Sequence, residues 1–585
     1  MQQTSDLSVN QIIDQAIFNN VFGTNFKFRH NQRATIIKIV DAYLANPNST
    51  VVIDAPTGTG KSLIAMWCSY IFKELGKQGY LVTSDLSLQD QYESDFYKFK
   101  LGWPSIRGIN NYDCHVNGLK FPLGECQMRN MSYDQAEKNL SCAATCDYIQ
   151  SRKKAMQMPV TLLNYSFWLI QRNYVAKKAI AREVEPPFKQ RDFIFFDEAH
   201  HIDEIVQNHF TPRIPYNFVD NLLEIRKFLQ SINLEYPHVT STILKELVYD
   251  LFKIQDKNVL FLKLKQLKSH LTSFLNTRSE VDKMSKKQFG KNIDKPMTPK
   301  WRKIYGQFDF VKDIFCKIED YIEIIADAGV DSMVFDQQEK EVRFMCLTEA
   351  KMIDKYLHQQ AGFKVFMSAT IGNPQDFTKI MGIKQAKIIK LADQFSYQKS
   401  PIVFVNKYKL SARERERNFK HVAKMLDQII QKHQGQRGII HTGSYAFSRQ
   451  ILEYTQYSDR LVKYIDSQQK KRSIQVFKSK PGAILIGPSI LEGLDLKDDI
   501  SRFQVFFKVP YPSLGDPLIK AKLNAQPIWY NWKTLNNLLQ GAGRSVRNKN
   551  DWAITYILDA CFESLLLTPN ALPNSFKNRI KIIEK

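Results

Sequence analysis

A glycine-rich loop within residues 51–62 constrains the fold more than any other part of the sequence. The β-branched run Val51–Ile53 stops there abruptly, and an apolar segment begins at Leu63. Only a strand-to-helix turn with glycines brings backbone N–H groups close to a phosphate chain without Cβ clashes. The residues expected to hold a nucleotide are Thr57, Gly58, Thr59, Gly60, Lys61 and Ser62.

Two side chains of this loop have separate expected roles. Lys61 would reach the outer phosphates, and the Ser62 hydroxyl would bind Mg²⁺. The strict phosphate-loop pattern begins with glycine, whereas this chain has Ala55 at that position. The prediction of nucleotide binding therefore rests on the loop together with a second motif downstream.

That second motif is an acidic pair at the end of another apolar run. Phe193–Phe196 has the pattern of a buried strand and leads into Asp197-Glu198-Ala199-His200. A carboxylate at the end of such a strand, beside a phosphate loop, can hold Mg²⁺ through its water shell. We therefore assign Asp197 to Mg²⁺ and expect Glu198 to orient or deprotonate the attacking water. ATP and Mg²⁺ are the predicted ligands.

Upstream of the loop, Gln32 is a candidate for adenine recognition. Its carboxamide offers a donor and an acceptor together to a purine edge. The residue begins an amphipathic pattern through Ile36, Ile39 and Val40 that predicts a helix.

The charge of the chain favours a polyanionic partner. The chain has 82 Lys and Arg residues and 59 Asp and Glu residues, which gives a formal net charge of +23. An excess of this size favours nucleic acid through counterion release. Residues 1–17 lack the apolar core of a secretory signal, and no apolar run reaches membrane-spanning length. We therefore expect a cytoplasmic protein with reduced thiols and no membrane partner.

Half of the eight cysteines fall within one short window. Four thiols so close together in a reducing compartment indicate one tetrathiolate site. Zinc ribbons usually show paired Cys-x₂-Cys knuckles, which this window lacks, while iron–sulfur clusters accept more varied spacing. The spacing alone leaves a cluster, a zinc ion and free thiols open for Cys114, Cys126, Cys142 and Cys146.

A large insertion and a second α/β series follow the acidic pair. Residues 205–345 show helical periodicity and predict a helical domain. The strand pattern Val365–Met367 then leads into Ser368-Ala369-Thr370, small hydroxyl residues suited to a relay from a γ-phosphate. A new α/β series begins at Ile402. It ends in Gln540–Arg547, a segment whose two arginines would reach across a cleft to stabilise the transferring phosphoryl group.

In this order the motifs resemble those of superfamily 2 helicases of the XPD/DinG type, along nearly the whole chain. By resemblance, Arg29 and Gln32 form the adenine motif. The segments that match the other motifs, in order, are Ala55–Ser62, Thr83–Gln91, Asp197–His200, Ser368–Thr370, His441–Ser444, Glu492–Asp495 and Gln540–Arg547.

The resemblance implies an α/β fold with two RecA-like parallel-sheet lobes, a [4Fe–4S] domain and a helical arch domain. It implies catalytic roles for Gln540, Arg544 and Arg547, a nucleotide contact for Asp495, and cluster ligation by the four clustered cysteines. The implied boundaries are 1–107, 158–204 and 346–396 for the first lobe, 108–157 for the cluster domain, 205–345 for the arch and 397–585 for the second lobe.

The function implied by the resemblance is an ATP-dependent DNA helicase that moves 5′→3′ along single-stranded DNA. Single-stranded and branched DNA are the expected partners of a monomer, together with a single-stranded-DNA-binding protein. Two alternatives stay open. One is a DEAH-type RNA motor, and the other is a zinc-stabilised nucleic-acid-binding ATPase without unwinding activity.

Overall fold

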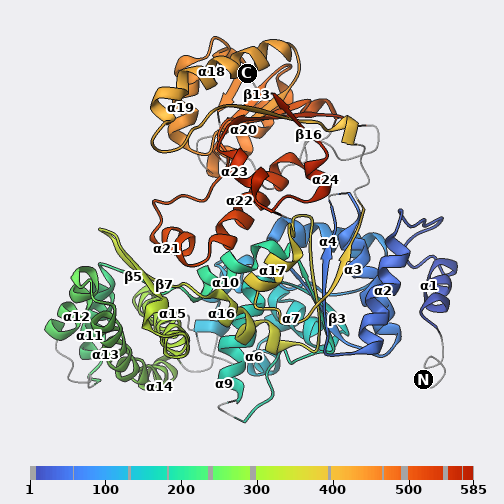
Figure 1. Ribbon diagram of the computed structural model, residues 1–585. Helices are drawn as coiled ribbons and strands as arrows, with labels where there is room; N and C mark the ends of the chain where they lie inside the picture. The colour runs from blue at the N-terminus through green and yellow to red at the C-terminus, as the bar shows by residue number, and fades with distance from the viewer. Residues whose placement is uncertain are drawn as a thin grey trace.

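The chain folds into two parallel-sheet lobes and a helical insertion, as a computed structural model shows (Figure 1). The structure describes residues 8–56, 58–128, 133–180, 183–234, 241–289, 298–392, 397–463, 467–488, 498–543, 551–569 and 571–583. Among these, no helix is both long enough and apolar enough to cross a bilayer.

The sheet of the first lobe has six strands, all paired in parallel, in the order β3-β2-β4-β8-β1-β9. Each of its inner strands is a nearly continuous apolar run, because helices cover both faces of such a sheet. The strands are β1 (Thr50–Asp54), β2 (Gly79–Thr83), β3 (Val160–Asn164), β4 (Phe193–Asp197), β8 (Phe363–Ser368) and β9 (Lys387–Lys390).

Helices on both faces complete this lobe, and the cysteine-containing segment is inserted between β2 and β3. The helices of the lobe are α1 (Val9–Phe18), α2 (Gln32–Ala45), α3 (Lys61–Glu74), α4 (Leu86–Lys98), α8 (Tyr165–Leu169), α9 (Ala176–Ile180), α10 (Ile202–Phe210), α16 (Glu349–Tyr356) and α17 (Pro374–Ile380). The inserted segment contains α5 (Glu125–Met128), α6 (Tyr133–Asn139) and α7 (Asp147–Gln157).

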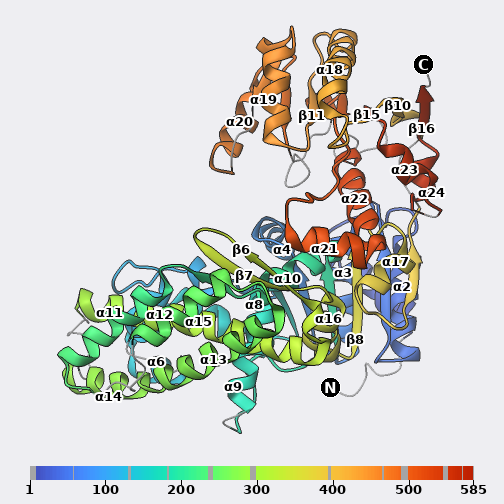
Figure 2. The ribbon, with the colours of Figure 1, turned by 60° about the vertical axis from the view of Figure 1, so that its left-hand side comes forward.

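The helical insertion projects from the first lobe beside α10 and α16 (Figures 1 and 2). Its helices are α11 (Phe218–Ser231), α12 (Ser241–Lys253), α13 (Lys257–Asn276), α14 (Arg278–Phe289) and α15 (Pro299–Ala328). A three-stranded antiparallel sheet forms its base, with β7 (Glu341–Cys346) between β5 (Arg213–Pro215) and β6 (Met333–Gln337). The sequence predicted the helices but few strands here.

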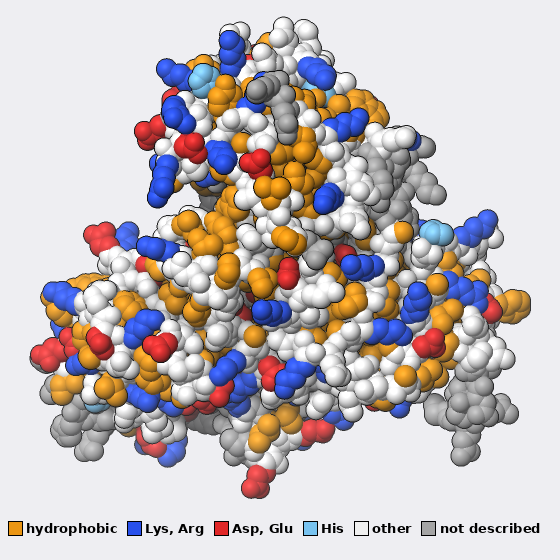
Figure 3. Space-filling model, viewed as in Figure 1, with side chains coloured by type: hydrophobic (Ala, Val, Ile, Leu, Met, Phe, Trp, Pro, Cys, Tyr) orange, Lys and Arg blue, Asp and Glu red, His pale blue; other side chains and the backbone are white. Residues whose placement is uncertain are grey.

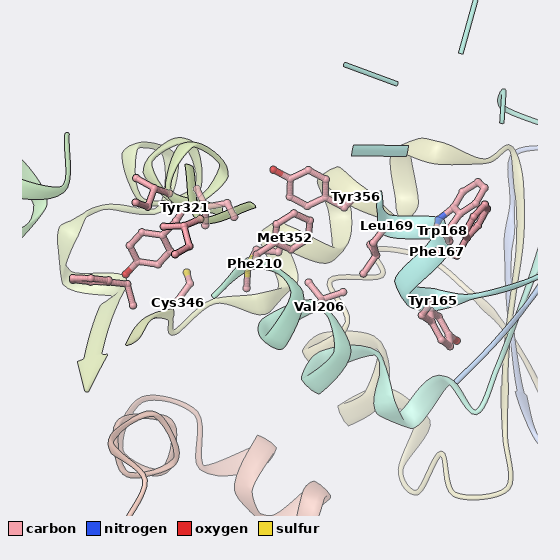
Figure 4. Packing of buried hydrophobic residues seen from close by; sticks show 14 of the residues in the cluster. Tyr165, Phe167, Trp168, Leu169, Val206, Phe210, Tyr321, Cys346, Met352 and Tyr356 are labelled. Carbon is pink, nitrogen blue, oxygen red and sulfur yellow. The ribbon is translucent and has the colours of Figure 1, made fainter. Parts of the chain in front are cut away.

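One apolar cluster joins the base of this insertion to the first lobe. Figure 4 shows it running from α8 through α10 and α16 to α15. Polar contacts cross the same boundary: Asn173 Nδ2 of the lobe donates to Asp320 Oδ2 of α15 at 2.6 Å, and Lys355 Nζ of α16 lies 2.7 Å from Glu323 Oε2 of α15. The insertion is therefore packed onto the lobe and not merely tethered to it.

The second lobe has a seven-stranded parallel sheet in the order β12-β13-β11-β14-β15-β10-β16. Its strands are β10 (Ile402–Tyr408), β11 (Gly438–His441), β12 (Leu461–Lys463), β13 (Ile484–Gly487), β14 (Phe503–Phe506), β15 (Ile554–Asp559) and β16 (Ile580–Ile583). Its helices are α18 (Arg415–Lys432), α19 (Tyr445–Tyr454), α20 (Ser467–Ser479), α21 (Pro517–Ala525), α22 (Pro527–Ala542), α23 (Phe562–Leu567) and α24 (Asn574–Lys577).

Helix α22 is shared between the two lobes. Trp529 and Trp532, in its first half, belong to the apolar core that also contains α10 and α16. Leu535 and Leu538, in its second half, belong to a core with β10, β14 and β15. Figures 1 and 2 both place α21 and α22 between the sheets of the two lobes.

Candidate functional site at the lobe interface

The phosphate loop has the backbone shape that its glycines predict. Strand β1 ends at Asp54, and α3 begins at Lys61. Gly58 and Gly60 have φ angles of +84° and +78°, which residues with a Cβ atom rarely adopt. The loop therefore depends on glycine at both positions.

Gln32 and Arg29 hold this loop from the side. The Gln32 Nε2 donates to the Thr59 carbonyl at 2.7 Å, and its Oε1 accepts from the Arg29 backbone N–H at 2.8 Å. The Arg29 guanidinium donates to the Gly58 carbonyl. Both ends of the buried Gln32 carboxamide are thus engaged by backbone. Adenine recognition by Gln32 stays a prediction, and positioning of the loop is what its contacts indicate.

Gly60→Ala is expected to abolish tight ATP binding, because a Cβ at residue 60 would lie 2.4 Å from Gln32 Nε2. The left-handed φ adds roughly 1–2 kcal/mol of strain. The measurement is equilibrium binding of a fluorescent ATP analogue. Gly76→Ala is the matched control, since Gly76 also has a positive φ but open space at its Cβ position. Equal affinity for the two variants would contradict the expected clash.

The acidic pair faces the loop from the end of β4. Lys61 Nζ lies 3.6 Å from Glu198 Oε1, and Asp197 Oδ1 accepts the Glu198 backbone N–H at 2.8 Å. Burial raises the pKa of Asp197 to about 6, with the negative charge of Glu198 adding to the shift and Lys61 opposing it. The loop lysine and both predicted carboxylates therefore share one site.

Tyr92 is a site residue that the sequence did not indicate. Its hydroxyl donates to Asp197 Oδ2 at 2.9 Å and is also hydrogen-bonded by Ser62. It therefore links the two predicted Mg²⁺-binding side chains. Tyr92 lies on α4, one residue beyond the predicted motif segment Thr83–Gln91. Extending that motif by one residue along its helix would have included Tyr92 among the predicted site residues.

The raised pKa of Asp197 predicts that protons compete with Mg²⁺. A carboxyl group with a pKa of about 6 is mostly protonated at pH 5.5. The Mg²⁺ concentration for half-maximal ATP hydrolysis is therefore expected to be about fourfold higher at pH 5.5 than at pH 7.5. Tyr92→Phe removes a hydrogen bond that lowers the pKa of Asp197, so its transition should lie at higher pH. ATP protonation is common to both proteins, so identical pH profiles would contradict the assignment.

A chain of hydrogen bonds runs from this site to the second lobe. His200 Nδ1 lies 2.7 Å from Ser368 Oγ and 3.3 Å from Glu198 Oε2. The Thr370 backbone N–H donates to Ser368 Oγ at 3.0 Å. Gln540, near the end of α22, contacts the other ring nitrogen of His200. His200 thus connects the acidic pair, the end of β8 and the second lobe.

A cleft of about 850 Å³ opens between the lobes beside the loop. From the first lobe it is lined by Asp54, Pro56 and the segment after β8, and from the second lobe by residues near Gly543 and α24. Burial raises the pKa of Asp54 to about 6, against the opposing charges of Lys390 and Lys61. Both lobes therefore contribute residues to the lining of this cleft.

Four predicted site residues lie outside the described residues, namely Thr57, Asp495, Arg544 and Arg547. Two other motif segments have capping contacts. Asp85 caps α4 by accepting the Leu88 N–H at 2.9 Å, and Ser444 caps α19 by accepting the Phe447 N–H at 3.2 Å.

The four clustered cysteines come together in the segment before β3. Three of them are buried, and Cys142 is partly exposed. Burial raises the pKa of Cys126 to about 11, and the charges of the three other thiols add to the shift. A Cβ on Gly124 would lie 3.3 Å from Cys114 Sγ. Among the described residues, no group of three or more His, Cys, Asp or Glu side chains is arranged to hold a single metal ion.

Basic side chains are not confined to one patch. On the face shown in Figure 3, lysine and arginine side chains spread over both lobes and the helical insertion, with acidic side chains among them. Several lysines of the insertion are paired, for example Lys303 with Glu224 at 2.7 Å.

Two parallel-sheet lobes, a phosphate loop, an acidic pair and a glutamine contact from the second lobe form the arrangement that the resemblance to superfamily 2 helicases predicts. Family comparison agrees in both halves of the chain. Residues 426–579 match the helicase C-terminal domain, and residues 25–227 match the res subunit of type III restriction enzymes.

Similar proteins confirm the predicted resemblance to the XPD/DinG type. The chain is 23% identical to the ATP-dependent DNA helicase YoaA of Escherichia coli, over 91% of each chain. It is 22% identical to YoaA of Haemophilus influenzae, over 97% of this chain and 98% of the relative. The fold resembles a solved XPD helicase with a TM-score of 0.59 at 15% identity, covering 95% of this chain and all of the other. An Xpd4 structure from S. tokodaii gives 0.57 at 14% identity, with the same coverage.

Proposed function

We propose that this protein is an ATP-dependent DNA helicase that moves 5′→3′ along single-stranded DNA and unwinds duplex or branched DNA. The observation that carries the proposal is the contact of Gln540 with His200, beside Lys61 and Glu198. A side chain of the second lobe thereby reaches the reaction site of the first. Hydrolysis at the site and movement of the lobes are coupled through this contact.

Each side chain of the site has a distinct role in hydrolysis. Lys61 exchanges its contact with Glu198 for the outer phosphates, which frees Glu198 to take a proton from the attacking water. Asp197 and Ser62 would hold Mg²⁺, and the bound ion would neutralise charge on the phosphates. Arg544 and Arg547 stabilise the transferring phosphoryl group from the second lobe. Arg29 and Gln32 position the phosphate loop and contact the adenine base. Asp495 contacts the nucleotide.

A strand-displacement assay tests the proposal. Duplexes with a 5′ or a 3′ single-stranded overhang are incubated with protein, ATP and Mg²⁺, and release of the labelled strand is followed. We expect release only from the 5′-overhang substrate and only with ATP. ATPase stimulation by RNA but not by single-stranded DNA would favour a DEAH-type RNA motor instead. Stimulation without strand release would favour a nucleic-acid-binding ATPase without unwinding activity.

We propose that Cys114, Cys126, Cys142 and Cys146 hold a [4Fe–4S] cluster. Four thiols that interact electrostatically, beside a glycine that leaves room at Cys114, support this assignment. A cluster would join the segment's short helices, which share few contacts with the main sheet. Residues 108–157 would then form a cluster domain, and residues 205–345 an arch domain.

Anaerobically purified protein is expected to absorb near 400 nm and to contain about four irons per chain. Cys126→Ser should lose most of this iron, because a serine hydroxyl binds iron much more weakly than a thiolate does. Cys68→Ser is the control, since Cys68 is buried in the core of the first lobe. A colourless protein with one zinc ion would show that the segment is a zinc site.

The partners that follow from this function are single-stranded and branched DNA, together with a single-stranded-DNA-binding protein. A monomer suffices, because the described cleft is formed by two lobes of one chain. The bacterial relatives support the cytoplasm of a bacterial or phage-infected cell as its location.

A further inference from the structure

Asn536 on α22 is a buried polar side chain that the site described so far does not use. Its side chain is 1% exposed, yet neither Oδ1 nor Nδ2 has a hydrogen-bond partner within the described part of the chain. Leaving both ends of a carboxamide unpaired in a protein interior costs free energy. Such a group in a native fold calls for a functional explanation.

The position of Asn536 in the helix is informative. Trp529, Lys533, Asn536 and Gln540 recur at spacings of four, three and four residues, so they lie on one face of α22. Trp529 and Lys533 are fixed to the first lobe, and Gln540 contacts His200. Asn536 lies between these two attachments, where the helix passes from one core to the other.

The attachment to the first lobe is a buried ionic network. The Trp529 indole N–H donates to Asp203 Oδ2 at 2.9 Å, and Lys533 Nζ lies 3.3 Å from Asp203 Oδ1. Asp203 is fully buried, three residues after His200. Lys522 of α21 pairs with the buried Glu349 and packs on the Trp529 ring. These contacts fix the first half of α22 against the helix that follows the acidic pair.

The loop after β8 lies between Asn536 and the interlobe cleft. Trp532 donates its indole N–H to the Ile371 carbonyl at 2.8 Å. Gly372, with a φ of +72°, packs so closely that a Cβ would lie 3.4 Å from Asn536 Oδ1. On its other side, the same loop lines the cleft with Thr370, Gly372 and Asn373. If a nucleotide in the cleft changed the conformation of this loop, the contacts of the loop with Asn536 would therefore change as well.

We propose that Asn536 is a positioning residue for ATP hydrolysis, and that its carboxamide pairs with the backbone of the 371–373 loop when nucleotide fills the cleft. Before nucleotide binds, the unpaired carboxamide is unfavourable in free energy, and α22 is already in position for the pairing. Pairing holds Gln540 in its contact with His200, beside the acidic pair. This inference rests on the proposed function, because it assigns a role within the same hydrolysis cycle.

Asn536→Leu tests the proposal, because leucine has the same number and branching of non-hydrogen side-chain atoms as asparagine and replaces both unpaired polar atoms with methyl groups. We expect the kcat of DNA-stimulated ATP hydrolysis to fall about tenfold, with KM for ATP within about twofold of wild type. The Tm should stay the same or rise, because unsatisfied polar atoms have been removed. Ser69→Ala is the matched control. It removes a different buried and unpaired polar group, the Ser69 hydroxyl, from the core of the first lobe and should leave kcat unchanged.

A second variant separates hydrogen bonding from packing. Asn536→Ser keeps a donor and an acceptor, and its kcat should lie within about threefold of wild type. An unchanged kcat in Asn536→Leu would overturn the proposal, and so would a kcat that falls together with Tm. A serine variant as slow as the leucine variant would also overturn it. A wild-type protein without DNA-stimulated hydrolysis would instead refute the proposed function.

Discussion

Glu198→Gln is expected to lower the kcat of ATP hydrolysis by about 10²–10⁴-fold while ATP still binds. Glutamine keeps the size of the side chain and its contact distance to Lys61, but it cannot accept a proton from water. The backbone at residue 198 has a φ of +49°, which both residues would adopt at similar cost. The loss should therefore appear in the chemical step and not in folding.

Steady-state hydrolysis and binding of a fluorescent ATP analogue together check this expectation. Glu74→Gln, at the C-terminal end of α3, is the control for loss of a carboxylate near the loop helix. A Glu198→Gln protein that hydrolyses ATP at the wild-type rate would refute the assigned chemistry. Loss of analogue binding would instead assign Glu198 to the binding of ATP.

Trp67→Ala is expected to lower the free energy of unfolding of the first lobe by about 3–5 kcal/mol. Trp67 is fully buried on α3, and its ring stacks on Phe22 with centroids 4.1 Å apart. Phe26 and Phe28 pack on it at 5.4 and 5.1 Å. Within the described residues its indole N–H has no hydrogen-bond partner, so the whole loss comes from packing.

The effect should extend to the nucleotide site, because these three phenylalanines lead into Arg29 and Gln32. Urea unfolding followed by circular dichroism measures the stability change, and the KM for ATP measures the effect on the loop. Trp67→Phe retains most of the packing and should lose less than half as much stability. Unfolding of Trp67→Ala at the wild-type urea concentration would contradict the role assigned to this aromatic cluster.

The sequence predicted the parts of the fold that local patterns specify. Apolar runs that stop in polar residues predicted β1, β2, β4 and β8, because strands buried on both faces need continuous apolar side chains. The same reasoning placed Lys61, Asp197 and Glu198 at one edge of a sheet. The structure brings all three together there.

Other features depend on contacts between distant segments, which no local pattern reports. Tyr92 resembles any helix aromatic until the fold brings it to Asp197, 105 positions away. The base contact of Gln32 stays a prediction, whereas the hydrogen bond from its Nε2 to the Thr59 carbonyl of the loop, 27 positions away, became visible only in the fold. The sequence could not predict that α22 is divided between two cores, because the helix would have the same apolar pattern if it packed against one core. The short strands β5–β7 were not predicted, because their sequences carry few strand signals and only their pairing with one another forms the sheet.

The strand order of the first lobe has a consequence for how the protein is made. Strand β1 pairs with β8 and β9, whose residues are synthesised about three hundred positions later. While the ribosome is still producing the inserted segments, both long edges of β1 lack their neighbours, and exposed edges of this kind recruit other chains. Nascent chains of this protein should therefore depend on chaperones until β9 emerges, whereas the helical insertion can form from its own local contacts beforehand.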